Sequence, residues 1–339
     1  MSIIPICSVC VANYNGAKFL EACLDSILAQ DFDQPVEIIV HDDCSTDNSR
    51  QLIRDKFPQA KLITSNENVG FCISNNRMVA IARGEYVLLL NNDAVLHQDA
   101  LKTLYDGALK YGKGIFGLAQ YDAETGELID IGSFLDPFFN PIPNLDPNEP
   151  NVAMIIGACL WVKKDLWDEI GGFPEWFGSM AEDMYLCCQA RLRGYPVMTF
   201  AESGFDHWVG SSFGGGKVKE NRRLSTSLKR RKLSELNKSY VLQISYPSPL
   251  FQIIFPIHII VLLVEGIIIS LIKFNLTIFK EIYLDCLINL FRNQKILRRK
   301  RRKTQAGRKV SPGKFIGPFR MLPHKIVMLL KFGIPKIKL

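Results

Sequence analysis

The first half of the chain alternates short apolar runs with segments in which apolar residues recur every three or four positions. The runs that predict strands are Ile6–Ala12, Val36–Val40, Lys61–Thr64 and Tyr86–Leu90. The segment 19–28, between the first two runs, has the apolar spacing of one helix face. Strands that alternate with helices in this way predict a doubly wound, mostly parallel α/β sheet.

The fourth run ends abruptly in polar residues. Tyr86–Leu90 leads directly into Asn91, Asn92 and Asp93. A continuous apolar run fits a strand that is buried on both faces, and ligands of open α/β sheets bind at the carboxyl ends of the strands. We therefore expect Asp93 to lie at the mouth of a site, where a carboxylate can hold a divalent cation against phosphate oxygens.

Two other expected strands also end in polar clusters. Asn13–Gly16 follows the first, and His41–Asp47 follows the second, where Ser45 or Thr46 is expected to cap a helix at 48–57. Because the carboxyl ends of parallel strands share one edge of a sheet, these clusters are expected to converge there.

The alternation of strands and helices becomes less regular after a predicted helix at 99–111 and a predicted strand at Ile115–Ala119. Five prolines between positions 137 and 150 predict a long surface loop near the site. A buried strand at Met154–Val162 and a helix at Ala181–Arg193 follow. That helix has Glu182 and Asp183 in its first turn, where favourable interaction with the helix dipole could alone explain two carboxylates.

Charge is distributed unevenly along the chain. Cys286–Leu339 contains 16 Lys and Arg and no acidic residue, whereas the preceding part has 25 basic and 34 acidic residues. Leu250–Ile272, just before this tail, is a 23-residue apolar segment that is long enough to cross a membrane. Glu265 within it, and the basic tail that follows, argue against a simple crossing.

We expect in-plane or hairpin helices on the cytoplasmic face of the membrane, with Arg298–Lys303 on anionic lipid headgroups. The alternative is a helical packing domain whose basic run is merely solvated. Nucleic-acid binding is not expected, because basic and aromatic residues are not interleaved there. We therefore expect an α/β domain at 1–235 and a helical, basic, membrane-associating region at 236–339.

The nine cysteines lie mostly within apolar runs, which favours reduced thiols in the cytosol over a disulfide framework. Cys7 and Cys10 have C-x-x-C spacing, but in a strand their side chains point to opposite faces, which argues against a zinc or redox site. No secretory signal is visible at the amino terminus.

Seven ordered elements between residues 5 and 210 resemble the inverting family 2 glycosyltransferases, which have the type A nucleotide-sugar-binding fold. The elements are Val11–Asn15, Asp42–Asp43 with Ser45 and Asp47, Asn68–Phe71, Asn91–Asp93, Gly171–Phe173, Glu182–Asp183 and His207. The combination of Asn68–Phe71 and Asn91–Asp93 is most similar to the rhamnosyltransferase-like branch of this family. Members of that branch commonly have a helical, basic carboxyl-terminal extension.

The resemblance implies where a nucleotide sugar binds. Asp42 and Asp43 would lie near the base and ribose, where a carboxylate can accept the N3–H of a pyrimidine. The further residues of this nucleotide-sugar site would be Ala12, Tyr14, Asn76, Asn91 and Asn92.

The resemblance also implies a divalent cation, Mg²⁺ or Mn²⁺, held by Asp93 and His207. Asn91 stands where the family's Asp-x-Asp element has its first acid, and a neutral amide is a weaker ligand. Without the resemblance, His207 fits a buried, hydrogen-bonded histidine beside Trp208. Asp206 is expected to be structural, because strand alternation points it away from His207.

Asp183 matches the family's catalytic base, and Glu182 would assist or orient it. Inverting transfer is a direct displacement in which a carboxylate removes the proton of the acceptor hydroxyl while a cation stabilises the leaving nucleoside diphosphate. The expected enzyme moves a sugar from a UDP- or dTDP-linked donor to a lipid-linked or growing glycan acceptor.

The alternative function is a non-catalytic, membrane-bound scaffold that binds nucleotide sugars or glycans. Asn91 at the position of the family's first acid supports this alternative. A nucleotidyltransferase fits poorly, because no Gly-rich, basic phosphate loop follows the first strand.

Overall fold

The computed structural model describes residues 4–209, 215–218 and 224–338, and it consists of two compact units. The first unit contains the chain up to residue 133 together with 143–190 and 195–208. The second contains 134–142, 191–194 and the chain from 209 onward. The expected division after residue 235 falls inside helix α7 (Leu228–Ser245).

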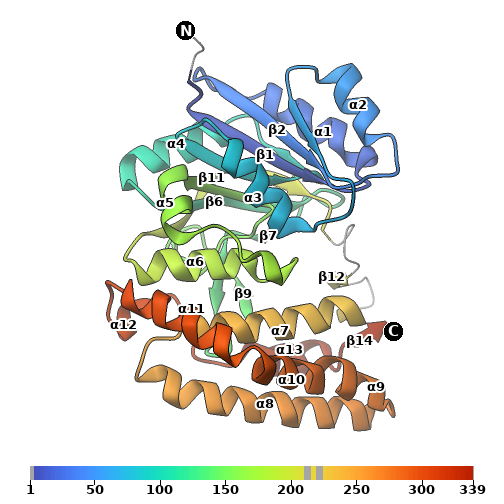
Figure 1. The fold of residues 1–339 in the computed structure, drawn as a ribbon, viewed down its shortest axis with the longest axis vertical. Helices are drawn as coiled ribbons and strands as arrows, with labels where there is room; N and C mark the ends of the chain where they lie inside the picture. The colour runs from blue at the N-terminus through green and yellow to red at the C-terminus, as the bar shows by residue number, and fades with distance from the viewer. Residues whose placement is uncertain (1–3, 210–214, 219–223, 339) are drawn as a thin grey trace. The chain divides into compact units, whose positions relative to one another are not determined.

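The first unit is built on one sheet with the strand order β3-β2-β1-β4-β10-β6-β11-β5, and β7 pairs with β6 (Figure 1). The strands are β1 Cys7–Asn13, β2 Val36–Asp42, β3 Lys61–Thr64, β4 Tyr86–Asn91, β5 Ala94–Leu96, β6 Ile115–Asp122, β7 Leu128–Asp130, β10 Cys159–Lys163 and β11 Val197–His207. Strands β3, β2, β1 and β4 are mutually parallel, and β11 is parallel to β6. β10 runs antiparallel to both β4 and β6. The expected doubly wound, mostly parallel sheet is confirmed.

Helices cover both faces of this sheet. They are α1 Ala17–Leu28, α2 Ser49–Lys56, α3 Phe71–Ile81, α4 Ala100–Tyr111, α5 Lys164–Ile170 and α6 Glu182–Leu192, with a short turn of helix η1 at Glu175–Phe177. One core contains Leu20 of α1 and Leu104 of α4 together with Val9 and Leu88 of the central strands. The strand residues that alternate with these, such as Leu89, are equally buried on the face where α3 packs. Burial on both faces explains why the central strands β1 and β4 are mostly apolar.

The second unit is mainly helical. Its helices are α7, α8 Leu250–Ile272, α9 Leu276–Ile278, η2 Phe279–Leu284, α10 Asp285–Arg292, α11 Gln294–Ala306, α12 Pro312–Phe315 and α13 His324–Phe332. Its strands β12 Gly215–Val218, β13 Leu224–Ser227 and β14 Lys336–Lys338 form a small sheet. Within the part of the chain that is described, α8 alone is long and apolar enough to cross a membrane, with a mean hydropathy of 2.5.

The proline-rich segment is not the structureless surface loop that we expected. It forms the paired strands β8 Ser133–Leu135 and β9 Pro141–Pro143, and Phe139 between them is fully buried. The carboxylate of Asp136 accepts hydrogen bonds from the backbone N–H groups of Phe138 and Asn140, which closes the turn. Prolines are compatible with such a short edge strand because an edge position does not need every N–H.

Two further local expectations were wrong. The strand predicted at Met154–Val162 begins at Cys159, since Gly157 donates its N–H to a side chain and not to a neighbouring strand. Helix α2 is not capped by Ser45 or Thr46. Its N-cap residue is Asn48, and the hydroxyl of Ser45 instead accepts the N–H of Asn15.

All nine cysteines are free thiols. Cys7 and Cys10 are both fully buried, and Cys7 belongs to the core shared with α1 and α4 whereas Cys10 does not. Their side chains therefore lie on opposite faces of β1, as the strand alternation predicts.

Candidate functional site

Asn13 connects three strand ends at the carboxyl edge of the sheet. Its Nδ2 donates to Asp42 Oδ2 at 3.0 Å, at the end of β2. Its Oδ1 accepts from Asn92 Nδ2 at 2.8 Å, just after β4. Asn13 is itself 1% exposed, at the end of β1. One buried amide thus fixes the polar groups that we expected to converge, although we had not assigned Asn13 to the site.

The two carboxylates at the carboxyl end of β2, Asp42 and Asp43, are both buried and both accept hydrogen bonds from loops. Asp42 accepts hydrogen bonds from Asn13, from the Ser45 N–H at 3.1 Å and from the guanidinium of Arg50. Burial acts to raise the pKa of Asp42, but the hydrogen bonds from Ser45, Arg50 and Asn13 outweigh it and lower the pKa below its ordinary value. Asp42 is therefore ionised at neutral pH.

Asp43 shapes the neighbouring turn. Its two carboxylate oxygens accept the backbone N–H groups of Val69 and Gly70, each at 2.8 Å. Gly70 has φ of +86°, a left-handed conformation that a side chain would disfavour, and it leads directly into α3. The Asn68–Phe71 element is thus held against the end of β2, beside the expected nucleotide pocket.

The other expected nucleotide-binding residues differ in their surroundings. Ala12 lies between His41 and Asn91 in the parallel ladder, and Tyr14 is 52% exposed. Asn76, on α3, is engaged elsewhere: its Nδ2 donates to the Phe173 carbonyl at 2.9 Å and its Oδ1 accepts the Phe173 N–H at 3.0 Å. The structure uses this amide to hold the Gly171–Phe173 turn, and a contact of Asn76 with nucleotide stays a prediction.

Asp93 and His207 meet at the same edge of the sheet. Strand β5, just after Asp93, pairs antiparallel with β11 and sets Ala94 opposite His207. Asp93 Oδ1 lies 3.1 Å from His207 Nε2, and both residues are buried. Asp206 points away, with its carboxylate 3.5 Å from His97 Nε2, as the strand alternation predicts.

These two side chains can hold a cation that is shared with a ligand. No group of three or more His, Cys, Asp and Glu side chains that could bind a metal occurs in the described ranges. Asp93 and His207 would therefore supply one oxygen and one nitrogen, and a diphosphate would supply further oxygens. Mg²⁺ is commonly held in this way, by one or two carboxylates and substrate phosphates.

Asp183 is anchored next to the end of β4. Its Oδ2 accepts the Gly157 N–H at 3.0 Å, and the next residue, Ala158, accepts the Asn91 N–H at 2.9 Å. This short chain of contacts brings Asp183, from α6, to the edge where Asn91 and Asn92 lie. Asp183 as a whole residue is only partly buried, which is compatible with contact between its carboxylate and a hydroxyl group of an acceptor.

Glu182 differs from its neighbour. It is 6% exposed, and its Oε2 has no hydrogen-bond partner. Burial raises the pKa of both carboxyl groups, and the nearby charge of Asp183 helps to raise the pKa of Glu182 to about 8. Burial and the closeness of the two groups therefore keep a proton on the Glu182–Asp183 pair at neutral pH.

The raised pKa of Glu182 predicts a pH-dependent stability. The folded state retains a proton that the unfolded state releases, so the stability present below about pH 4.5 is lost as the pH rises toward 8. Glu182→Gln cannot titrate, and we expect it to gain at most about 5 kcal/mol over the wild type at high pH, at about 1.4 kcal/mol per pKa unit. Thermal melting from acid to alkaline pH measures the difference. Glu124→Gln, at an exposed site, is the control, and parallel curves for wild type and Glu182→Gln would refute the assignment.

Two residues of this edge were missed by the sequence reasoning. Gln120 is 1% exposed, and its Nε2 lies 2.8 Å from His207 Nδ1. Asp130 is directly opposite Gln120 in the β6–β7 pair. Burial raises the pKa of Asp130 to about 6, while nearby His207 lowers it and Asp183 raises it. A polar residue within the apolar run of β6 was the available signal for Gln120.

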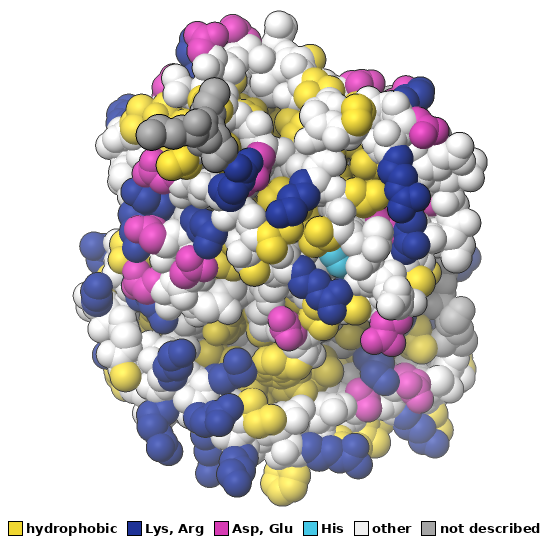
Figure 2. All heavy atoms as spheres, turned by 45° about the horizontal axis from the view of Figure 1, so that its top comes forward, with side chains coloured by type: hydrophobic (Ala, Val, Ile, Leu, Met, Phe, Trp, Pro, Cys, Tyr) yellow, Lys and Arg dark blue, Asp and Glu magenta, His cyan; other side chains and the backbone are white. Residues whose placement is uncertain are grey.

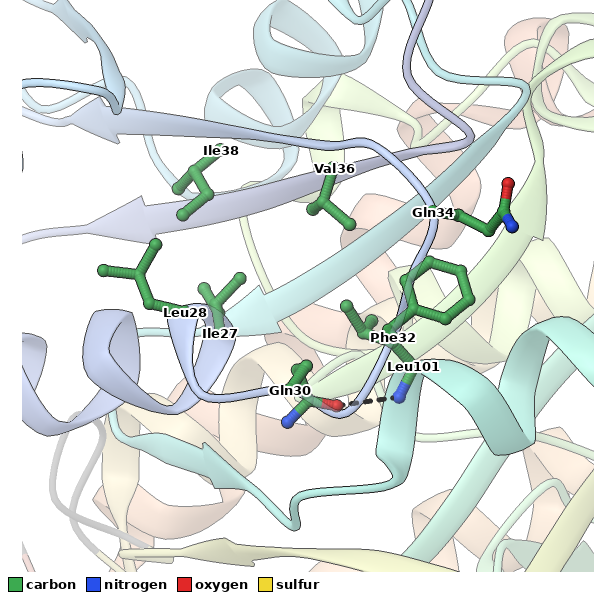
Figure 3. Close-up of a pocket in the computed structure, with 8 residues that line it drawn as sticks. All are labelled: Ile27, Leu28, Gln30, Phe32, Gln34, Val36, Ile38 and Leu101. Carbon is green, nitrogen blue, oxygen red and sulfur yellow. Dashed lines mark hydrogen bonds between the residues drawn. The ribbon is translucent and has the colours of Figure 1, made fainter.

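A separate small cavity of about 190 Å³ lies at the opposite end of β2 (Figure 3). Its walls are mainly apolar side chains, including Ile27, Phe32 and Val36, and Gln30 is tied to the Leu101 N–H. Val36 begins β2, whereas Asp42 ends it. This cavity contains none of the expected site residues.

The arrangement defines a type A nucleotide-sugar-binding α/β fold, and comparisons with known proteins identify its family. Residues 8–171 match glycosyl transferase family 2. The chain is similar to an N-acetylglucosaminyl-diphospho-decaprenol L-rhamnosyltransferase of Mycobacterium tuberculosis, with 26% identity over 215 residues, which cover 54% of this chain and 69% of the relative. The chain therefore carries a family 2 glycosyltransferase domain, which confirms the expected family.

Other similarities cover different shares of the chain. Glycosyltransferase GlyG of Streptococcus pneumoniae is 33% identical over 102 residues, which cover 29% of this chain and a third (33%) of the relative's length. The structure of mannosyltransferase PcManGT from Pyrobaculum calidifontis, in complex with GDP-Man and Mn²⁺, superposes with a TM-score of 0.53 at 18% identity. That match covers 94% of this chain and 86% of the other, and at such low identity it supports the fold alone.

Proposed function

We propose that the protein is an inverting glycosyltransferase that moves a sugar from a nucleoside diphosphate to a lipid-linked or growing glycan acceptor. The proposal rests on the contact between Asp93 and His207 at the carboxyl edge of the sheet. Asp183 is held at the same edge by its hydrogen bond from the Gly157 N–H, in a chain that matches family 2. The rhamnosyltransferase relative acts on a decaprenol-linked sugar by its name, which supports a lipid-linked acceptor.

The donor would lie along the carboxyl edge of the sheet. Asp42 and Asp43 would face the base and ribose, since their oxygens retain lone pairs beyond those used by the loops. A pyrimidine nucleotide, as in a UDP- or dTDP-sugar, would donate its N3–H there. Asp93 and His207 would hold Mg²⁺ or Mn²⁺, which stabilises the negative charge of the leaving diphosphate.

Asp183 would remove the proton of the acceptor hydroxyl as that oxygen attacks the anomeric carbon from the side opposite the leaving group. The Gly157 N–H fixes one carboxylate oxygen and the Met184 N–H contacts the other, at 2.7 Å, which sets the direction of the remaining lone pairs. Glu182, which keeps its proton, adds no second charge beside the base.

Transfer assays test the proposal. The purified chain is incubated with radiolabelled UDP-, dTDP- and GDP-linked sugars, Mn²⁺ or Mg²⁺, and membrane extract. The expected result is a labelled glycolipid or glycan from one donor, lost on chelation of the metal. Calorimetric donor binding with neither transfer nor hydrolysis in any combination would overturn the proposal and favour a scaffold, the function that Asn91 in place of an acid would suit.

Membrane association is the second part of the proposed function. Helix α8 exposes many apolar side chains, and its exposed large hydrophobic residues are Ile253, Ile257, Ile260, Val264, Ile267, Ile268, Leu271 and Ile272. The opposite face is buried against other helices of the second unit: Gly266 contacts Tyr283 so closely that a Cβ would clash. A large exposed apolar surface of this kind commonly marks a membrane or protein contact.

The charged residue within α8 supports an in-plane or hairpin arrangement. Glu265 binds the guanidinium of Arg231 on α7 and the ammonium of Lys325 on α13, the latter at 2.7 Å. A separate crossing of the membrane by α8 would break these ion pairs inside hydrocarbon, at high cost. The apolar face of α8 would instead lie in the outer part of the cytoplasmic leaflet.

Helix α11 carries the charge that anionic lipid would meet. Lys295, Arg298, Arg299 and Arg302 line a hollow of about 420 Å³ on this helix. Figure 2 shows Lys and Arg side chains gathered toward the lower edge of the view, next to exposed apolar side chains. Basic residues near an anionic surface contribute about 1 kcal/mol each.

We expect the combined Arg298→Glu, Arg299→Glu and Arg302→Glu variant to bind anionic vesicles at least about 100-fold more weakly, since three favourable contacts are lost. Flotation with phosphatidylglycerol vesicles measures the binding. Lys102→Glu, an exposed site on α4, is the charge control. Unchanged flotation of the triple variant would contradict the assignment of α11, and equal flotation with neutral vesicles would leave the apolar face of α8 as the anchor.

A further inference from the structure

Gln120 contacts the imidazole of His207 at the ring nitrogen that does not face Asp93. Gln120 Nε2 lies 2.8 Å from His207 Nδ1, and His207 Nε2 lies 3.1 Å from Asp93 Oδ1. Gln120 is 1% exposed, His207 7% and Asp93 3%. The three side chains form a buried row, so their hydrogen-bond partners come from the protein and not from bulk water.

The orientation of the Gln120 amide decides which nitrogen of His207 carries the proton. A neutral imidazole has one N–H donor and one nitrogen that can accept or ligate. With the amide NH₂ of Gln120 donating to Nδ1, the N–H lies on Nε2 and points to Asp93. In that arrangement Nε2 has no lone pair for a cation.

Two buried oxygens beside this row have no hydrogen-bond partner: Gln120 Oε1 and Asp130 Oδ1. Asp130 is directly opposite Gln120 in an antiparallel pair, so the two side chains project from the same face of the sheet. Buried polar atoms without partners are uncommon and call for an explanation. A half-turn of the amide exchanges its oxygen and nitrogen, so that Gln120 Oε1 can accept the Nδ1–H of His207 and the NH₂ turns to the side on which Oε1 lay.

We propose that Gln120 is a positioning residue that selects the cation-binding tautomer of His207. With its oxygen turned to His207, Gln120 accepts the Nδ1–H, and Nε2 becomes free to ligate a cation together with Asp93. The amide NH₂ then faces away from His207, on the side of the Asp130 carboxylate. The inference rests on the proposed function, because it takes Asp93 and His207 to be the cation ligands.

Metal affinity tests this role directly. Mn²⁺ binding to the full chain is measured from the electron paramagnetic resonance signal of free Mn²⁺, with UDP and separately with GDP present. Gln120→Leu cannot accept the Nδ1–H, and we expect it to bind Mn²⁺ about 10- to 100-fold more weakly, the usual effect of losing the group that orients a metal-binding histidine. Gln120→Glu can act only as an acceptor when ionised, and it should bind Mn²⁺ at least as tightly as the wild type.

The controls separate this inference from the proposed function. Gln34→Leu, at an exposed position, makes the same chemical change elsewhere and should have no effect. If Asp93→Asn and His207→Ala retain Mn²⁺ affinity, the proposed cation site itself is wrong. If they lose it while Gln120→Leu does not, only the role of Gln120 is overturned.

The tautomer provides a second measurement that a merely structural role would not change. The chain has five histidines, so ¹⁵N-resolved imidazole spectra of the metal-free protein can be assigned with His207→Ala as reference. We expect Nδ1 of His207 to carry a proton in Gln120→Glu, whereas in Gln120→Leu the proton should lie on Nε2 alone. The same tautomer in both variants would refute the proposal even if Gln120→Leu were too unstable for metal titrations.

Discussion

Replacing Asp183 with asparagine is expected to lower kcat by a factor of about 100 to 10,000, the usual contribution of a general base. Asparagine has the same shape, and its oxygen can still accept the Gly157 N–H that anchors the carboxylate. It cannot accept a proton from an acceptor hydroxyl at neutral pH. Because Asp183 is assigned to the acceptor side, the affinity for the donor should be unchanged.

Initial rates with the active donor, together with calorimetric donor titration, separate these two effects. Asp165→Asn makes the same substitution at an exposed acid in the first turn of another helix, α5, and should retain full activity. Full activity of Asp183→Asn would remove Asp183 from the reaction. A parallel loss of donor affinity and kcat would assign the residue to donor binding and not to proton removal.

Replacing Glu235 with glutamine is expected to cost the second unit about 3–5 kcal/mol, the usual effect of breaking a buried ion pair from one side. Glu235 is 2% exposed and pairs with three cations, of which Lys238 lies at 2.7 Å and Lys325 at 2.6 Å. Arg231 is the third, at 3.3 Å. Glutamine would leave three positive charges close together with one fewer counter-charge.

Burial acts to raise the pKa of Glu235, but Lys238, Lys325 and Arg231 outweigh it and lower the pKa well below 4.5. The stability that Glu235 contributes is therefore present above about pH 4.5 and is lost as the pH falls through the lower, folded-state value. Urea unfolding of wild type and variant near neutral pH measures the cost. Glu281→Gln removes a half-exposed partner of Lys232 and should cost less than about 1 kcal/mol. Equal midpoints for the two variants would contradict the prediction.

The strands that build the site could be predicted because each is buried on both sides. Tyr86–Leu90 is apolar throughout, and the polar residues that follow it mark one edge of the sheet. Asn13, Asp42 and Asn92 lie at this edge, at or just after the ends of β1, β2 and β4. Local sequence contains this information, since burial and strand direction are properties of the run itself. The direction of β10 was not predictable, because an apolar run of five residues pairs equally well in either direction.

The contacts that orient the site residues depend on segments distant in the sequence. Asn76 is 97 positions from Phe173, whose backbone engages its amide, and Gln120 is 87 positions from His207. The resemblance to a family supplied roles for Asp93, Asp183 and His207, but neither it nor the residue pattern indicates which side chains hold them. Prolines between 137 and 150 misled the prediction for a related reason: whether a proline lies in a loop or on an edge strand is decided by its distant neighbours.

The nine free thiols have a practical consequence for measuring ligand binding. Eight of them are buried, whereas Cys44 is partly exposed, next to Asp43 in the loop after β2. Burial also raises the pKa of several of the buried thiols, Cys10, Cys23 and Cys159 among them, which suppresses their reaction with electrophiles. A maleimide fluorophore would thus attach first at Cys44, and the wild-type chain could serve as an optical reporter of donor binding without the removal of any cysteine.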